Sequence, residues 1–381
     1  MPTSTIELSL SALRKNIEFL KSQIKDTKIS SVVKANAYGH GLKEFVQMAI
    51  ECGIDHFSVF SSEEAKTIIE NTSAPIDIMV LGWINDNDFN WLISEGIEFY
   101  VFDFDRLAKL LGVARRLNKT AKIHIDLETG MNRTGFDKKD VRKLIEILKQ
   151  NKDSIRLKGL CTHFAGAESI ANYKRINDQI KLFNRIHKQF IKNELIPETK
   201  HAACSAASLS YPKTQFDMVR IGILQYGFWP SVETHIQFLS KHDLQSDPLN
   251  QVLSWKSSIM TIKEVKTGEF ISYGTSYLAQ KDMKIAIVPV GYAYGYARSL
   301  SNHGRVLING QRVGVIGMVN MNMLIADITT IEKVVVGDEV VLIGKQGDLS
   351  INVSSFTEFS DQLNYELLTR LPADIPRVII K

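Results

Sequence analysis

The sequence predicts an α/β protein made of an N-terminal (β/α)₈ TIM barrel and a mainly-β C-terminal domain. Its 381 residues are too many for one ordinary hydrophobic core, which predicts two domains. Short apolar runs alternate with amphipathic stretches over the first 225 residues, whereas strand and turn patterns dominate from Trp255 onward. An open doubly wound sheet is the alternative to the barrel, but no GxGxxG motif opens the first helix.

Eight apolar runs rich in β-branched or aromatic residues predict the barrel strands, at 31–33, 56–60, 76–81, 99–102, 122–127, 157–162, 200–203 and 218–221. Most intervals between them hold an amphipathic stretch, of which 138–150 is the clearest. Eight strands that alternate with helices predict a closed barrel over residues 11–235.

The C-terminal domain is expected over residues 236–381. Segment 230–250 is polar and irregular, which predicts a linker or excursion. Asn309-Gly310 predicts a hairpin turn between two of the strands that are expected at 285–288, 305–308, 313–316 and 339–343. Residues 6–10 alternate between apolar and polar, so we expect the N-terminal segment 1–10 to join the sheet of this domain.

Composition and charge disfavour several classes of function. The formal net charge of +4 is small and no cluster of Lys and Arg stands out, which disfavours nucleic acid as a partner. No run approaches 18 apolar residues and no secretory signal is recognisable, so we expect a cytoplasmic protein without a membrane partner. The three cysteines fit neither a disulfide framework nor a metal site, and the histidines form no HExxH motif. We therefore expect no metal.

Lys34 opens the most informative segment, KANAYGHG, directly after the first predicted strand. A lysine at the end of a buried strand is costly to bury as a cation, unless it is neutral or consumed in a Schiff base. Tyr38, Gly39 and Gly41 offer a hydroxyl and open backbone to an anion. The alternative is a lysine that reaches water before a glycine-containing turn.

Other unusual residues fall at the carboxyl ends of predicted strands, which form the working face of such barrels. They are Arg133, His163, Ser205, Arg220 and Gly222. Phosphate sites in these barrels use the loops after strands seven and eight, where a Ser hydroxyl and Gly backbone suit a phosphate. From spacing alone, Arg133 could be a solvated loop residue, His163 a satisfied rim histidine, Ser205 a helix N-cap and Arg220 half of a structural pair.

The C-terminal domain has two candidate segments of its own. Segment 271–276 reads ISYGTS, and the alternative is a surface aromatic residue before a turn. Segment 317–323 reads GMVNMNM, for which simple strand packing is the alternative.

Seven segments occur in the order found in the alanine racemase family, and the chain resembles that family over nearly its whole length. They are VVKANAYGHG, ETGMNRTG, THFAGAE, HAACSAAS, MVRIGI, ISYGTSY and VPVGYAYGY. The resemblance implies an isomerase that uses pyridoxal 5'-phosphate (PLP) to interconvert L- and D-alanine and so supplies D-alanine. It also implies a homodimer whose active sites each combine one subunit's barrel with its partner's β domain.

The resemblance also implies a role for individual residues in binding the cofactor and in proton transfer. Lys34 would be the Schiff-base lysine and one catalytic base, and Tyr273 of the partner subunit would be the opposite base. Arg220 would face the pyridine nitrogen, His163 would line the ring, and His201 would link Arg220 to that tyrosine. The phosphate would be held by Tyr38, Ser205, Gly222 and Ile223.

Substrate contacts are implied in the same way. Arg133 and the backbone of Met321 of the partner subunit would receive the substrate carboxylate, and Tyr292 would line the entrance. Racemisation removes an α-proton and returns one to the other face, so two opposed bases are the simple solution. An arginine is a poor proton donor, so Arg220 should suppress transamination.

Four positions depart from the family pattern. Asp126 stands where many relatives carry a lysine that is often carbamylated, and its carboxylate could orient Arg133 without carbon dioxide. Asn322 and Tyr294 stand where aspartates are usual, and Ala373 stands in place of a pocket tyrosine. A broader racemase that also acts on serine is therefore one alternative. The others are a fold-related PLP decarboxylase and a non-catalytic PLP-binding protein.

Overall fold

The computed structural model describes residues 2–24, 26–357 and 364–381. The chain forms two compact units. One holds Ala12–Ala35 and Val46–Asn250; the other holds Met1–Ser11, Asn36–Phe45 and Gln251–Lys381. Residues Asn36–Phe45 therefore group with the C-terminal part of the chain, which no periodicity in the sequence indicates.

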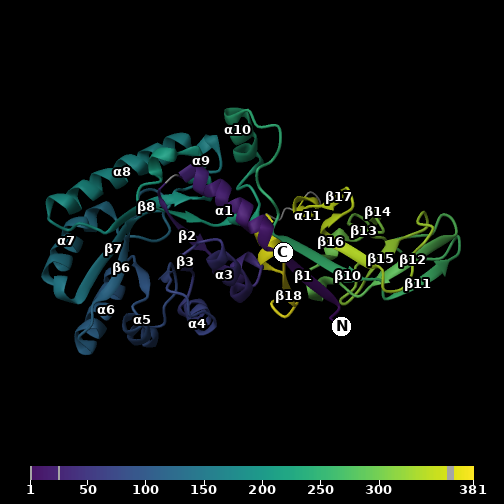
Figure 1. Ribbon diagram of the computed structural model, residues 1–381, viewed down its shortest axis with the longest axis horizontal. Helices are drawn as coiled ribbons and strands as arrows, with labels where there is room; N and C mark the ends of the chain where they lie inside the picture. The colour runs from purple at the N-terminus through teal and green to yellow at the C-terminus, as the bar shows by residue number, and fades with distance from the viewer. Residues whose placement is uncertain (1, 25, 358–363) are drawn as a thin grey trace. The chain divides into compact units, whose positions relative to one another are not determined.

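The first unit is a closed barrel of eight parallel strands, and all eight predicted strands are confirmed (Figure 1). Buried side chains on both faces explain why these runs are rich in β-branched and aromatic residues. The strands are β2 (Lys28–Val32), β3 (His56–Val59), β4 (Asp77–Val80), β5 (Glu98–Val101), β6 (Ala121–Asp126), β7 (Ile155–Cys161), β8 (Thr199–Cys204) and β9 (Met218–Ile221).

Helices alternate with the strands and cover the outside of the barrel (Figure 1). Their N-caps follow ordinary rules: Ser61 and Asp103 each accept a hydrogen bond from a backbone N–H of the first turn. The helices are α1 (Leu10–Ile24), α3 (Leu42–Glu51), α4 (Ser62–Asn71), α5 (Phe89–Ser94), α6 (Phe104–Leu117), α7 (Val141–Gln150), α8 (Tyr173–Lys192) and α9 (Ser205–Ser210). Short 3₁₀ turns include η4 (Ile170–Asn172), η5 (Pro212–Thr214) and η6 (Ile223–Tyr226).

The predicted linker at 230–250 was wrong over its first half, which forms helix α10 (Val232–His242). The Ser231 side chain caps its start by accepting from the Thr234 N–H, and Asp243 ends it in a left-handed conformation. The expected domain boundary at residue 235 lies inside this helix.

The second unit contains two sheets, one of seven strands and one of three. The seven-stranded sheet has the order β14-β13-β16-β10-β1-β18, and β17 pairs with β16. The three-stranded sheet has the order β11-β12-β15. The strands are β1 (Ser4–Ser9), β10 (Leu253–Ser258), β11 (Thr261–Val265), β12 (Met283–Val288), β13 (Arg305–Ile308), β14 (Gln311–Gly314), β15 (Leu324–Asp327), β16 (Glu339–Gln346), β17 (Leu349–Ile351) and β18 (Arg377–Ile380).

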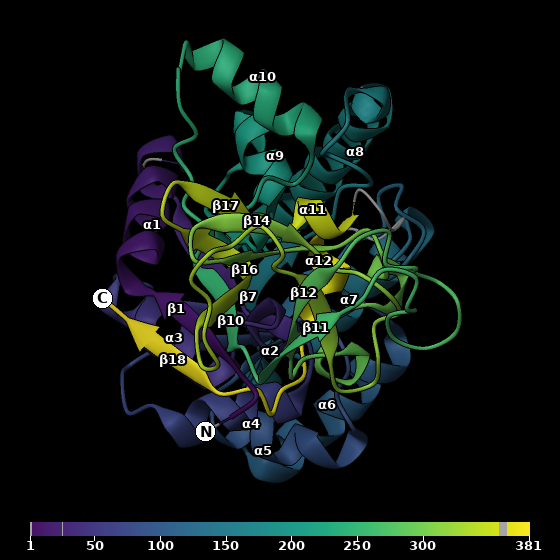
Figure 2. The same ribbon diagram turned by 90° about the vertical axis from the view of Figure 1, so that its right-hand side faces the viewer.

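Both ends of the chain belong to this larger sheet. β1 pairs with β10 and, in parallel, with β18, so the predicted N-terminal strand is confirmed (Figure 2). The Asn309-Gly310 hairpin is also confirmed, because both residues have positive φ and β13 pairs antiparallel with β14. The short helices α11 (Ser354–Thr357) and α12 (Asn364–Thr369) precede β18.

None of the described helices combines the length and the apolar character needed to cross a membrane. Within the same residues, no group of three or more His, Cys, Asp or Glu side chains is arranged to hold a metal ion.

Candidate active site

Lys34 begins a turn of left-handed helix, α2 (Lys34–Tyr38), immediately after the first barrel strand. The four residues Ala35–Tyr38 have φ angles between 52° and 54°. L-residues pay roughly 1–2 kcal/mol each for this conformation, so it persists only where other contacts hold it. Asn36 supplies two of them: its backbone oxygen accepts from the Gly41 N–H at 3.0 Å, and its side chain accepts from the Leu42 N–H at 2.8 Å.

The strand end before Lys34 is fixed by side chains of η6, the turn that follows β9. The Val32 carbonyl accepts from the Gln225 side chain at 3.1 Å and from the Tyr226 hydroxyl at 2.9 Å. Glu64 accepts from the Ala35 N–H at 2.7 Å on the other side of Lys34. Lys34 is therefore held at the carboxyl end of its strand, where sequence analysis expected it.

The pKa of Lys34 is lowered by burial and by the nearby cations Arg133 and Arg220, with Glu64 acting in the opposite direction. A lowered lysine pKa raises the fraction of neutral amine, which is the form able to act as a nucleophile or base. The structure thus gives Lys34 the chemical character that its position suggested.

Arg220 lies buried on β9 with its guanidinium fixed by three hydrogen bonds. Nη1 donates to His201 Nδ1 at 2.5 Å, and Nη2 donates to the carbonyl oxygens of Thr162 and Ala202 at 2.8 and 3.0 Å. Because three of its five N–H groups have fixed acceptors, the guanidinium plane has a single orientation.

His201 was expected to link Arg220 to Tyr273 of the partner subunit; the contact with Arg220 is present, and the contact with the partner's Tyr273 stays a prediction. Its second ring nitrogen, Nε2, lies 2.9 Å from His124 Nδ1 inside the barrel. Both nitrogens of His201 are thus engaged within the chain, by Arg220 and by His124.

Ser205, Gly222 and Ile223 come together beyond the carboxyl ends of β8 and β9. The Gly222 N–H donates to Ser205 Oγ at 2.9 Å, and Ile223 starts η6. Ser31 pairs with Ile221 across β2 and β9, which brings the strand that ends before Lys34 alongside this pair. A hydroxyl and backbone N–H groups at a strand end suit the oxygens of a phosphate.

Two further predicted cofactor residues fall in different compact units. His163 is half-buried beyond the end of β7, and its pKa is lowered to about 3 by burial and by Arg220, Arg133 and Lys34. Its ring is therefore neutral, as a ring that lines an aromatic cofactor requires. Tyr38 belongs to the second unit, where its ring centroid lies 6.0 Å from that of Tyr365.

Asp126 ends β6 as a buried carboxylate. The Thr134 hydroxyl donates to its Oδ2 at 2.9 Å, whereas no hydrogen bond or ion pair joins Asp126 to Arg133 among the described residues. The expectation that Asp126 orients Arg133 directly is therefore corrected: its charge acts on the exposed Arg133 side chain only through space. Burial raises the pKa of Asp126 to about 7, against the opposing effects of Thr134, Arg220 and Arg133.

The second unit presents Tyr273, Met321 and Tyr292 on connected loops. The Ser272 hydroxyl donates to the Met318 carbonyl at 2.7 Å, which ties segment 271–276 to segment 317–323. The Tyr292 N–H donates to the Asn320 carbonyl at 3.0 Å. The Tyr273 side chain is 71% exposed and Met321 is 56% exposed, so both are available to another molecule.

The remaining departures are surface features of the second unit. Asn322 and Ala373 are exposed, and Tyr294 lies in a short 3₁₀ turn, η7 (Tyr292–Tyr294). The structure shows no reason for the Asn322 and Tyr294 replacements.

Sequence reasoning missed a group of buried polar residues inside the barrel. They are His56, Glu98 and His124, with the half-buried Lys158 beside Glu98. One signal was present: alternation along β6 places His124 and Asp126 on the same face of the strand.

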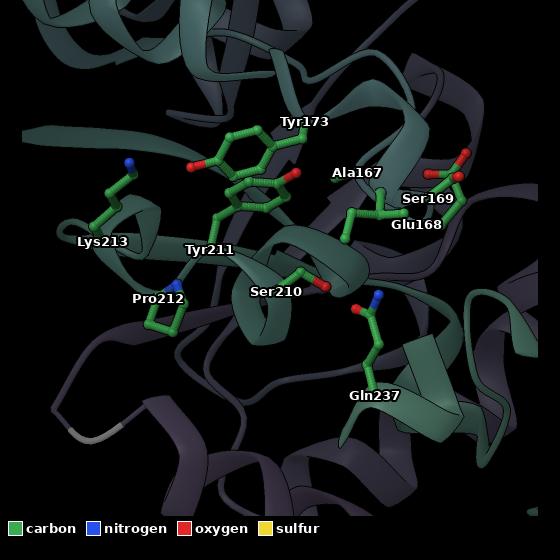
Figure 3. Close-up of a pocket in the computed structure, with 10 residues that line it drawn as sticks. Ala167, Glu168, Ser169, Tyr173, Ser210, Tyr211, Pro212, Lys213 and Gln237 are labelled. Carbon is green, nitrogen blue, oxygen red and sulfur yellow. The ribbon is translucent and has the colours of Figure 1, made fainter. Parts of the chain in front are cut away.

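A separate cavity of about 390 Å³ lies near the starts of η4 and α8 (Figure 3). The rings of Tyr173 and Tyr211 stack in it with centroids 6.4 Å apart. Its remaining lining residues include none of the predicted site residues.

Comparisons with known proteins agree with this geometry. The sequence model "Alanine racemase, N-terminal domain" matches residues 8–230, and "Alanine racemase, C-terminal domain" matches residues 252–379. The alanine racemase of Leptospira interrogans is 34% identical, over 99% of this chain and 96% of that protein.

Solved structures resemble the whole chain. Alanine racemase from Bacillus anthracis with bound L-Ala-P has a TM-score of 0.90 at 30% identity, covering 100% of this chain and 96% of that one. Alanine racemase from Bartonella henselae with covalently bound pyridoxal phosphate has a TM-score of 0.85 at 25% identity, covering 100% of both chains. Histidine racemase from Leuconostoc mesenteroides has a TM-score of 0.88 at 27% identity, covering 99% of this chain and 98% of that one. By its sequence and by its fold, this chain belongs to the alanine racemase family.

Proposed function

We propose that this protein is a PLP-dependent isomerase that interconverts L- and D-alanine. The observation that carries the proposal is the placement of Lys34, an amine with lowered pKa at a strand end, near the fixed guanidinium of Arg220. Membership of the family and the covalently bound pyridoxal phosphate of the Bartonella henselae structure support the choice of cofactor.

The residues present fit PLP at both of its ends. Lys34 would hold the cofactor covalently through Nζ, and Ser205, Gly222 and Ile223, with Tyr38, would hold its phosphate. Arg220 would face the pyridine nitrogen, and the neutral ring of His163 would lie along the cofactor ring. When bound, PLP takes up the electrons that remain when the α-proton of the amino acid leaves.

The protein's own residues would then move two protons. Lys34 Nζ, released from the cofactor when the amino group of the substrate takes its place, would hold or take the α-proton on one face, and the hydroxyl of Tyr273 of the partner subunit would do so on the other. Tyr273 is exposed in the single chain, as a residue that completes a neighbour's site must be. Arg220 keeps its protons, because a guanidinium is a very weak acid. It therefore contributes charge and orientation and transfers no proton.

Arg133, with the backbone of Met321 of the partner subunit, would receive the substrate carboxylate, and Tyr292 would line the entrance. Arg133 is exposed near Lys34 and Arg220, which gives this corner of the barrel a positive character. A carboxylate arriving there gains charge-assisted hydrogen bonds. We further propose a cytoplasmic homodimer that supplies D-alanine, for which the three free cysteines are consistent with a reducing compartment.

Racemisation of serine as well as alanine is the second candidate function, and the exposed Ala373 favours it. A panel of L-amino acids, scored for their D-enantiomers by chiral chromatography, tests the activity and its breadth together. The panel should include alanine, serine and histidine. D-Alanine well ahead of the others supports the proposal; carbon dioxide release without D-enantiomers would indicate a decarboxylase instead.

Borohydride reduction tests the cofactor separately. Reduction should fix PLP to the peptide that contains Lys34, which mass spectrometry identifies. A protein that takes up no PLP, or carries it on another lysine, contradicts the assignment of Lys34. A protein that binds PLP, but whose rate of D-alanine formation does not change on Tyr273→Phe, would be a non-catalytic PLP-binding protein.

A further inference from the structure

Four buried side chains form a continuous hydrogen-bonded chain through the barrel interior, from Arg220 to Glu98. Arg220 Nη1 lies 2.5 Å from His201 Nδ1, and His201 Nε2 lies 2.9 Å from His124 Nδ1. His124 Nε2 lies 2.8 Å from Glu98 Oε2. The four residues come from β9, β8, β6 and β5, and we call them the Arg220–Glu98 chain.

The two ends of this chain fix the direction of every hydrogen bond in it. A guanidinium only donates, so His201 Nδ1 must accept and His201 must carry its proton on Nε2. That proton is donated to His124 Nδ1, so His124 must carry its own proton on Nε2 and donate it to Glu98. A carboxylate only accepts, so the order of donors from Arg220 to Glu98 is consistent at each step.

The charges at both ends are retained inside the barrel. Burial alone would raise the pKa of Glu98, but hydrogen bonds from His124 and His56 outweigh it and hold the pKa well below its ordinary value. Glu98 is 2% exposed, and Lys158 Nζ lies 3.1 Å from its other oxygen. Burial and the adjacent Arg220 lower the pKa of His201 well below its ordinary value, so the ring between the charges stays neutral.

Gly159 on β7 shows that the fold makes room for the central contact. A Cβ at this position would lie 2.0 Å from His124 Nδ1 and 2.9 Å from His201 Nε2, between the two bonded nitrogens. Glycine weakens a strand interior and often marks a close approach. Here the approach is that of the two histidine rings.

We propose that Glu98 is a positioning residue for Arg220, which it orients by fixing both histidines of the Arg220–Glu98 chain in their Nε2–H form. If Glu98 no longer accepts from His124, only the contact with Arg220 opposes a proton on Nδ1 of either ring. A His201 Nδ1–H would point at the guanidinium, a donor facing a donor, and Arg220 would have to leave its contacts with Thr162 and Ala202. The effect on catalysis rests on the proposed function, in which Arg220 faces the cofactor.

Nitrogen-15 NMR of histidine side chains in the full-length wild-type protein tests the chain without any use of activity. With and without added PLP, His201 and His124 should each show a protonated Nε2 and an unprotonated Nδ1 at neutral pH. A protonated Nδ1 on either ring, or two protonated nitrogens, overturns the proposal. Because this measurement needs no turnover, a protein that fails to racemise leaves its result intact.

Variants test whether the fixed protonation matters for the site. Glu98→Gln removes the charge and the obligatory acceptor, and Gly159→Ala separates the two rings without removing a charge. Glu198→Gln is the matched control, since Glu198 binds Lys158 at 3.1 Å but lies outside the chain. We expect both test variants to change the His201 protonation pattern. We also expect about a tenfold fall in kcat with unchanged KM for alanine, by analogy with the lower end of the loss seen when the carboxylate partner of a metal-binding histidine is removed.

The control variant should leave the histidine spectrum and kcat as in the wild type. Thermal unfolding of each variant separates loss of stability from loss of positioning, and a test variant that fails to fold leaves the wild-type spectrum as the deciding measurement. A folded Glu98→Gln protein with the wild-type His201 pattern and the wild-type kcat overturns the proposal, even if it is less stable.

Discussion

The Thr134 hydroxyl donates to Asp126 Oδ2 at 2.9 Å, which supplies the buried carboxylate at the end of β6 with a partner from the chain itself. The resemblance to the family implies a lysine at this position in many relatives, which would become an anion only by reacting with carbon dioxide. Asp126 supplies its own carboxyl group, whose pKa burial raises to about 7, and Thr134 holds it close to the strand end that leads to Arg133.

We therefore expect activity that does not depend on bicarbonate. Purified protein in degassed buffer should racemise alanine at the same initial rate with and without added bicarbonate. A clear rise in rate on adding bicarbonate would show that another residue has to be carbamylated first.

The raised pKa of Asp126 also predicts how stability varies with pH. Its pKa in the folded protein, about 7, lies above the ordinary value for aspartate of about 3.8, so between these pH values the folded protein holds a proton that the unfolded chain has released. The contribution of Asp126 to the free energy of unfolding is therefore present at low pH and is lost as pH rises from about 4 to about 7. The full effect of three pKa units is about 4 kcal/mol, an upper bound for a buried carboxylate.

Asp126→Asn tests this sign, since the amide keeps the shape and does not ionise. Relative to the wild type, the variant should gain free energy of unfolding between pH 5 and pH 8, measured with urea. Thr134→Val is a useful companion, because loss of its hydroxyl should raise the pKa of Asp126 further and shift the transition to higher pH. If the difference in free energy of unfolding between Asp126→Asn and wild type shrinks as pH rises, the raised pKa of Asp126 is contradicted.

The left-handed turn after Lys34 predicts a large difference between two Gly→Ala substitutions. Gly39 has a φ of +79°, and a Cβ there would lie 1.9 Å from the Leu368 carbonyl oxygen. Gly112 lies inside α6 with nothing within 4 Å. Gly39→Ala should lower the free energy of unfolding by about 2 kcal/mol or more, whereas Gly112→Ala should raise it by up to about 1 kcal/mol.

Affinity for PLP separates these two variants further. The turn carries Tyr38, so a shifted backbone at Gly39 should weaken PLP binding measured by absorbance titration, and Gly112→Ala should leave it unchanged. Equal effects of the two substitutions on stability and on PLP binding would show that the turn is not held as described.

The exposed Ala373 predicts that substrate breadth is adjustable. Ala373→Tyr restores a ring where many relatives carry one, and should raise the ratio of kcat/KM for alanine to that for serine. Ala373→Ser is the control for a small polar change. A serine-to-alanine ratio that is the same in all three proteins would show that position 373 does not limit the substrate.

The barrel was predictable from sequence because each strand is buried on both faces and so appears as an apolar run. The same is true of the Asn309-Gly310 hairpin, whose two positive φ angles need those residue types. Helix α10 was missed because its apolar residues are sparse; Phe238 is buried, but Ile236 faces solvent. The Ser231 cap was its one local signal.

The interior of the site was harder to predict, because it depends on contacts between strands. Glu98 and His56 are each the first residue of a strand, where a polar residue looks like the end of a loop. Only the register of the barrel brings Glu98 into contact with both His56 and His124. The left-handed turn at Ala35–Tyr38 opposes the local preference of those residues, so no propensity indicates it. Gly39 and Gly41 were the visible hint.

Subunit complementation tests the central claim most directly, namely that Lys34 and Tyr273 of the partner subunit act in one site. Lys34→Ala and Tyr273→Phe proteins with different affinity tags should each be inactive alone. In the purified mixed dimer, one site of the two keeps both residues, so about half of the wild-type rate of D-alanine formation should return. A mixed dimer that remains inactive, while wild-type dimers carrying the same tags racemise alanine, would contradict a site shared between subunits.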